Sequence, residues 1–151
     1  MQSRSTFKMS TIAILLAIVC GLLSSSVSAK ADSDDRPCSN RTLYGNYGLT
    51  LIGEILAPGI QARGLVMQHY DGQGNVTQVD HIVINGNPPV KEWTPGTGTY
   101  SVNPDCTGVG VVNSPSVPDP VHLHFVVTDH GKQINEVVDG DATTTIGIKV
   151  D

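Results

Sequence analysis

The sequence predicts an all-β protein, a single eight-stranded antiparallel barrel of mainly up-and-down type. From Cys38 onward, apolar stretches alternate with clusters of Gly, Pro, Asn and Asp, and none keeps apolar residues at helical spacing. The links are short, which favours antiparallel pairing between consecutive strands. At 151 residues the chain has the length of one domain. A barrel removes the exposed edges of an open sheet, whereas a sandwich, the alternative, keeps them.

Residues 1–29 have the pattern of a secretory signal peptide. Arg4 and Lys8 supply the positive start, 11–23 is a nearly unbroken apolar run, and 27–29 is the small-residue pattern before cleavage. The run is shorter than the roughly 20 apolar residues that span a bilayer. We therefore expect cleavage, a secreted or periplasmic location, and no membrane span afterwards.

The segment after this signal, residues 30–37, is polar, acidic and ends in proline. Such a composition is typical of a disordered lead. We therefore place the start of the barrel domain at residue 38 and its end at residue 151.

Eight strands are expected in the barrel domain. Their ranges are 43–56, 60–70, 76–85, 92–102, 107–112, 121–128, 133–138 and 143–150. The separators carry residues that adopt positive φ or lack an N–H, features that end strands and close hairpins. In chain order they are 58–59, 71–75, 87–89, 103–105, 114–120, 129–132 and 139–141.

The strand at 121–128 shows how two faces are assigned. Leu123, Phe125 and Val127 alternate with His122 and His124, so the apolar set is expected to face the core. An eight-stranded barrel is just wide enough to be filled by side chains or to hold one small ligand.

Two cysteines remain once Cys20 is removed with the signal. In an oxidising exported compartment, Cys38 and Cys106 of a small domain are expected to form a disulfide. A redox or metal pair would need close spacing such as C-x-x-C, which these residues lack.

Charge and motifs exclude several classes of function. Fourteen acidic and nine basic residues give a net charge of −5, and the basic residues are scattered along the chain. We therefore do not expect the protein to bind nucleic acid. The G-x-S-x-G elbow of a serine hydrolase is missing. His122 and His124 share a strand face and could share a metal, with His69, His81, Asp80 or Glu136 as a third ligand. No full ligand set is visible, so no metal or cofactor is predicted.

Glu54 and Arg63 are the best candidates for a polar anchor inside the barrel. If residues 58–59 form a two-residue turn, Glu54 lies directly across from Arg63 between apolar strands. Inside the barrel such a pair would orient a ligand head group, while on the outside it is an ordinary surface pair. Tyr47 and Tyr100 rank next, because a buried tyrosine hydroxyl needs a partner and could polarise a ligand oxygen.

Several motifs also carry a resemblance to a known family. They are Cys38-Ser39-Asn40, LYGNYGL at 43–49, YDGQGNV at 70–76, GTGTYSVNPDCTG at 96–108 and HFVVTDHGK at 124–132. In this order the chain resembles small exported bacterial proteins related to the allene oxide cyclase barrel, which is lipocalin-like. The plant cyclases isomerise a fatty-acid epoxide in an apolar cavity. We carry none of their catalytic positions over to this chain.

Three function classes remain. We favour an exported barrel that binds a small, largely apolar molecule in its interior, since this needs only an apolar lining and one or two polar anchors. An isomerase or cyclase of the allene oxide cyclase type needs those anchors placed at a reacting bond. A structural envelope or interaction protein is the third class.

Overall fold

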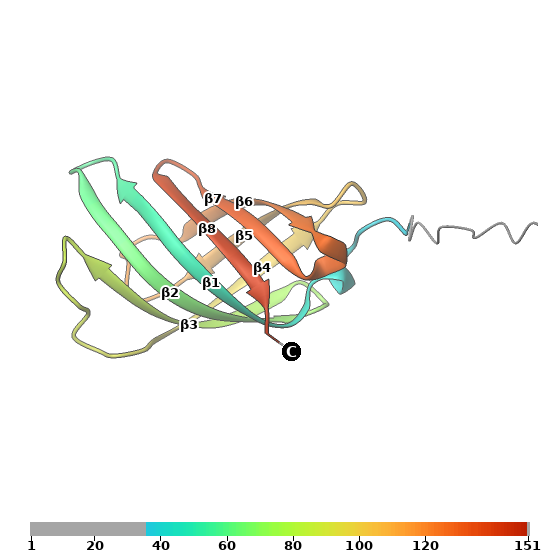
Figure 1. Ribbon diagram of the computed structural model, residues 1–151, viewed down its shortest axis with the longest axis horizontal. Coiled ribbons are helices and arrows are strands. Elements are labelled where there is room, and N and C mark those ends of the chain that lie inside the picture. Colours follow the sequence, from blue (N-terminus) through green and yellow to red (C-terminus); the bar gives the residue numbers. More distant parts are fainter. Residues whose placement is uncertain (1–35, 151) are drawn as a thin grey trace, which may run out of the picture. The chain divides into compact units, whose positions relative to one another are not determined.

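The computed structural model describes residues 36–150, which form a closed antiparallel β-barrel (Figure 1). The strands are β1 (Tyr44–Ile55), β2 (Ile60–Asp71), β3 (Asn75–Ile84), β4 (Thr94–Val102), β5 (Thr107–Asn113), β6 (Val121–Thr128), β7 (Gln133–Val138) and β8 (Ala142–Lys149). Two short 3-10 helices, η1 (Asn40–Thr42) and η2 (Asp129–Gly131), complete the fold.

Each strand pairs with the next in the chain, and β8 closes the barrel against β1. In this register, Thr50 of β1 pairs with Leu65 of β2 on one side and with Ile146 of β8 on the other. This order confirms the predicted eight-stranded up-and-down barrel, and the sandwich alternative is wrong. The observed strands coincide with the expected ones to within two residues at each end.

The alternation of side chains divides the strands as predicted. Leu123, Phe125 and Val127 of β6 are buried, while His122 and His124, which alternate with them, are exposed. Because all eight strands turn one face inward, the barrel interior holds the core.

We call one end of the barrel the closed end. It is filled by the buried side chains of Leu43, Tyr47, Tyr70 and Tyr100, and it also holds the Cys38–Cys106 disulfide. Both η1 and η2 lie there, at the right in Figure 1. The three rings pack edge to face, with centroids 5.3 Å apart for Tyr47 and Tyr70 and 4.9 Å for Tyr70 and Tyr100. The disulfide confirms the expected pairing and ties the residues before η1 to the β4–β5 turn.

The predicted signal peptide at 1–29 lies outside the described residues, as does most of the predicted lead at 30–37. Residues 36 and 37 have no regular secondary structure. Among residues 36–150, no helix has the length and apolar character needed to cross a membrane.

Candidate functional site

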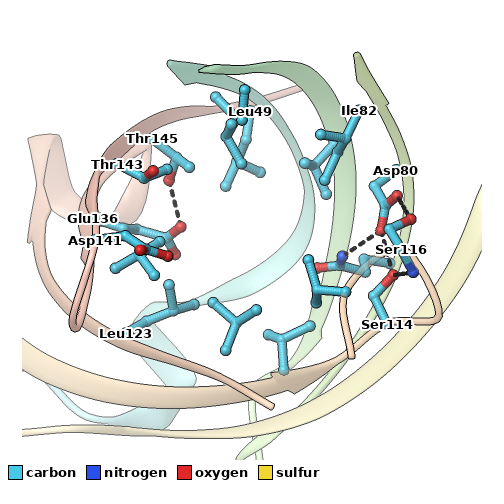
Figure 2. A pocket seen from close by; sticks show the side chains of 18 of the residues that line it. Leu49, Asp80, Ile82, Ser114, Ser116, Leu123, Glu136, Asp141, Thr143 and Thr145 are labelled. Carbon is cyan, nitrogen blue, oxygen red and sulfur yellow. Dashed lines mark hydrogen bonds between the residues drawn. The ribbon is translucent and has the colours of Figure 1, made fainter. Parts of the chain in front are cut away.

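A cavity of about 110 Å³ lies inside the barrel, away from the closed end. Apolar side chains, among them Leu49, Ile82 and Leu123, form much of its wall (Figure 2). The residues around it come from β1, β2, β3, β5, β6, β7 and β8, from the loop after β5 and from the β7–β8 turn. We call this half of the barrel the cavity end.

Two carboxyl groups interrupt this apolar wall, and strand alternation explains why they point inward. In β3, Asp80 shares a face with Gln78 and Ile82. In β7, Glu136 shares a face with Ile134 and Val138. Figure 2 shows the two carboxyl groups on opposite sides of the cavity.

Asp80 is completely buried and is held by three hydrogen bonds. The Ser116 hydroxyl donates to its Oδ1 at 2.6 Å, and the Ser114 hydroxyl donates to its Oδ2 at 2.7 Å. The Gln78 side-chain amide also donates to Oδ2, at 3.0 Å. A carboxylate offers about four acceptor sites, so the residues around Asp80 use most of its capacity.

Glu136 is 4% exposed and has fewer partners. The Thr145 hydroxyl donates to its Oε2 at 2.5 Å, and the Tyr70 hydroxyl lies 3.2 Å from its Oε1. Burial raises the pKa of this carboxyl, and the two hydroxyl contacts oppose the shift without cancelling it. The pKa of Tyr70 is also raised well above its ordinary value, first by burial and then by Glu136.

A chain of side chains links the two carboxyl groups along the interior. The Tyr70 hydroxyl donates to Gln68 Oε1 at 2.6 Å, and the Gln68 amide donates to Gln78 Oε1 at 3.0 Å. Since Gln78 in turn donates to Asp80, the chain runs from Glu136 to Asp80 without a gap. Such a network holds its members in place because each buried polar group is satisfied by the next.

Two more polar groups line the cavity on the side where Figure 2 shows Glu136, namely Thr143 of β8 and Asp141 in the β7–β8 turn. Thr143 is 6% exposed, yet its hydroxyl forms no hydrogen bond with any residue in 36–150. The half-buried Asp141 carboxylate likewise has no side-chain partner among those residues. Both line the cavity, so they present unused acceptors to whatever occupies it.

The ionisable side chains that line the cavity are all acidic. Asp80, Glu136 and Asp141 line it, and no Lys, Arg or His of the described chain does. Anionic groups placed in this low-dielectric space meet repulsion, and cationic groups meet attraction.

The predicted pairing of Glu54 with Arg63 is wrong. Ile55 pairs with Ile60 around a four-residue turn, so Glu54 lies opposite Gln61 and Arg63 opposite Ile52. Both charged side chains are exposed on the outer face, and Arg63 donates to the backbone oxygens of Ala62 at 2.7 Å and Gly53 at 3.1 Å. Neither lines the cavity. A role for them in ligand binding stays a prediction.

Tyr47 and Tyr100 are buried as expected, and their hydroxyls have partners at the closed end. Tyr47 donates to the Gly131 backbone oxygen, and Tyr100 lies 3.0 Å from the backbone oxygens of Asn40 and Leu43. These contacts fix η1 and η2 against the barrel. Neither tyrosine lines the cavity.

The histidines considered as metal ligands lie outside the barrel interior. His122 and His124 are exposed on the outer face, and the His124 ring lies 2.9 Å from Asp139 Oδ1. Asp80 and Glu136, considered as third ligands, point into the interior instead. Within residues 36–150, no group of three His, Cys, Asp or Glu side chains could hold a metal ion.

Sequence reasoning treated Asp80 and Glu136 only as spare metal ligands and missed their role as cavity groups. The signal was present in the alternation, because each occupies an inward position between apolar residues of its strand. Tyr70, whose hydroxyl begins the chain between them, carried no site prediction.

Comparison with known proteins assigns no family to this chain. No family model matches the chain, and no match is found among curated proteins. Among solved structures, the chain is similar to a redesigned β-barrel, mFAP1, whose structure holds bound DFHBI. The identity is 18%, the TM-score is 0.49, and the match covers 73% of this chain and 97% of that one.

Proposed function

We propose that the protein is an exported barrel, of the allene oxide cyclase-like type, that binds a small, largely apolar molecule in its interior. The observation that carries the proposal is the cavity of about 110 Å³, with apolar walls and unpartnered polar groups on one side. Concave, mostly apolar sites with a few polar groups are the usual form of small-molecule sites. The Cys38–Cys106 disulfide is consistent with an oxidising, exported location.

The size of the cavity limits the ligand. An engineered apolar cavity of about 150 Å³ binds benzene, and the present cavity, at about 110 Å³, is of the same order. The ligand is therefore a compact molecule or the terminal group of a larger one, of the size of a single ring.

The test uses small molecules that co-purify with the protein, identified by mass spectrometry, together with toluene as a defined probe. Leu51 lines the cavity, and its neighbour Ile52 is 52% exposed on the outer face. Leu51→Phe fills space in the cavity, whereas Ile52→Phe adds the same ring outside, so it is the matched control. We expect Leu51→Phe to weaken toluene binding, measured by NMR titration, and Ile52→Phe to leave it unchanged. Equal effects of the two variants would contradict an interior site.

An isomerase or cyclase is the second candidate, and Glu136 favours it. A buried carboxyl with a raised pKa beside a tyrosine hydroxyl resembles a general acid held ready at a cavity wall. This candidate predicts that a co-purifying molecule is converted to an isomer of the same mass. Chromatography of the bound fraction before and after incubation distinguishes turnover from simple binding.

A further inference from the structure

The loop between β5 and β6, residues 114–120, forms the part of the cavity wall that β4 does not. Ser114, Ser116 and Val117 of this loop line the cavity. No residue of β4 does, although the structure describes the whole of that strand. This side of the wall is therefore made of loop, and loops are held less firmly than strands paired on both edges.

The residues of β4 and of the loop explain why the loop enters the barrel. Gly96 of β4 is buried, and a Cβ there would lie 2.9 Å from the Asn113 backbone oxygen and 3.3 Å from the Ser114 Cβ. Glycine thus leaves the space that the start of the loop fills. Three of the seven loop residues are proline, which lacks the N–H needed to extend the β5–β6 ladder.

Asp80 holds the loop in place from a strand that is not its neighbour. It belongs to β3, and β4 lies between β3 and β5 in the sheet. The Ser114 hydroxyl donates to its carboxylate at 2.7 Å and the Ser116 hydroxyl at 2.6 Å (Figure 2). Two further hydrogen bonds, from the N–H groups of Ser116 and Val117 to Ser114, stay within the loop. We call the two bonds to Asp80 the latch.

The cavity reaches the end of the barrel at which this loop lies. Ile55 at the end of β1, Ile84 at the end of β3 and Val138 at the end of β7 all line it. The closed end, at the other ends of these strands, is filled by aromatic rings. A ligand therefore has its shortest path to the cavity past the β5–β6 loop.

The latch can open without leaving a buried charge unsatisfied. Asp80 is completely buried while the loop is in place, and a buried carboxylate needs hydrogen-bond donors. If the loop moves outward, water replaces the two serine hydroxyls, and the Gln78 amide still donates to Asp80. Because bonds to water replace bonds to protein, the net free energy of opening is modest.

We propose that the β5–β6 loop is the gate of the interior site and that the hydrogen bonds from Ser114 and Ser116 to Asp80 keep it closed. This inference rests on the proposed function, because it concerns how a ligand reaches the same cavity. The ligand enters when the two hydroxyls leave Asp80 and the loop moves away from β4. When the loop returns, Val117 again forms part of the wall and the ligand is retained.

A gate is recognised by its effect on rates. Weakening the latch raises the fraction of time for which the loop is open, so a ligand enters and leaves more often by the same factor. The dissociation constant is the ratio of the two rates, so it stays nearly the same. A residue that only lines the wall changes the affinity instead, mainly through the dissociation rate.

The first experiment uses toluene as the probe and measures its association and dissociation rates by NMR exchange spectroscopy. Ser116→Ala removes one latch bond and adds no bulk to the cavity. We expect both rates to rise about tenfold, which is the effect of losing one hydrogen bond to a charged group, with a nearly unchanged dissociation constant. Ser101→Ala is the matched control, because it removes an exposed hydroxyl from β4 and should change neither rate.

Asp80→Asn is the second variant, and it tests the other side of the latch. Asparagine has nearly the same shape, but it offers an amide group where the carboxylate has an acceptor oxygen. Both toluene rates should therefore rise in this variant too. A retained toluene affinity shows that the variant has folded.

The second experiment measures access to the cavity without a ligand. Val112 is 5% exposed and lines the cavity beside the loop. Since Cys38 and Cys106 are paired, Val112→Cys places a reactive thiol in the wall. Methyl methanethiosulfonate, a compact reagent, should label this thiol about tenfold faster when Ser116→Ala is added, because labelling follows the open fraction. Adding Ser101→Ala should leave the labelling rate unchanged.

The outcomes separate this inference from the proposed function. If Ser116→Ala and Asp80→Asn leave toluene exchange unchanged and Ser116→Ala does not speed labelling, the gate is overturned while the interior site stands. A weaker toluene affinity with an unchanged association rate would also overturn it, since Ser116 would then act only as part of the wall. If toluene does not bind but Ser116→Ala still speeds labelling, the loop opens as inferred and the proposed function is wrong.

Discussion

The two ends of the barrel treat buried polar groups in opposite ways. At the closed end, the hydroxyls of Tyr47 and Tyr100 donate to backbone oxygens of η2 and of residues 40–43, which are fixed by the chain itself. At the cavity end, Asp80 and Glu136 are held by side chains of Ser, Thr, Gln and Tyr. Side-chain partners can rotate when a ligand arrives, whereas backbone oxygens cannot.

The two ends of the barrel also differ in how densely they are packed. Aromatic rings and a disulfide fill the closed end, and the cavity lies in the other half. Close packing stabilises a fold, while a cavity with unpartnered acceptors lowers stability in exchange for a binding site. The difference indicates that the closed end holds the barrel together and that function lies at the cavity end.

The largest expected effect is the loss of stability when the disulfide at the closed end is removed. The disulfide spans a sequence separation of 68 residues, and a loop of that length corresponds to about 4 kcal/mol of stabilisation in the chain-entropy model. The double variant Cys38→Ser with Cys106→Ser should lose about this much free energy of unfolding, measured by denaturant titration. Toluene binding at a temperature where the variant is folded should be retained. Loss of binding in the folded variant would contradict the division between the two ends.

The second prediction uses two glycines of β5 that both face the interior. A Cβ at Gly108 would overlap the Phe125 ring and lie 2.7 Å from the Ser101 backbone oxygen, whereas at Gly110 the nearest atom is 3.5 Å away. Gly108→Ala should therefore destabilise the fold by about 1–3 kcal/mol, as overpacking does. Gly110→Ala is the matched control and should be close to neutral. Equal melting temperatures for the two variants would show that the closed end has room to adjust.

The strands could be predicted because they depend on local signals. Alternating faces and Gly-, Pro- or Asn-rich separators are read over a few residues, and β6 and β7 have the expected bounds. The register of β1 with β2 could not be predicted as safely, because it depends on the length of one turn. A four-residue turn in place of a two-residue turn moved the partner of Glu54 from Arg63 to Gln61.

The candidate site was harder to predict than the strands, for a different reason. Buried acidic residues are rare, so an acid in a strand is first assigned to the surface. What allows Asp80 and Glu136 inside is a set of donors distant in sequence, from Tyr70 to Ser116 and Thr145. Only the closed barrel brings these donors together, so local sequence patterns cannot show that the buried carboxyls are satisfied.

The smallest expected effect, and the last prediction, concerns one carboxyl from each end of the barrel. Asp71, the last residue of β2, has its pKa lowered to about 2, first by the Asn75 side-chain amide and then by backbone N–H groups. Glu136 has its pKa raised above the ordinary 4.5 by burial. The two groups therefore give opposite dependences of stability on pH.

The sign for each follows from which state binds the proton more tightly. Asp71 stabilises the fold above its unfolded pKa of 3.8, and this contribution is lost as the pH falls through about 2. Glu136 binds its proton more tightly in the folded protein, so its contribution is complete below 4.5 and is lost as the pH rises through its higher folded pKa. Denaturant titrations across this pH range should show that Glu136→Gln removes the decline above pH 4.5. Asp71→Asn should leave that decline unchanged and reduce the loss at acid pH, by a small amount because Asp71 is at the surface. If Glu136→Gln leaves the decline unchanged, burial does not raise the pKa of Glu136. In that case this carboxyl does not lower the stability of the cavity end at neutral pH.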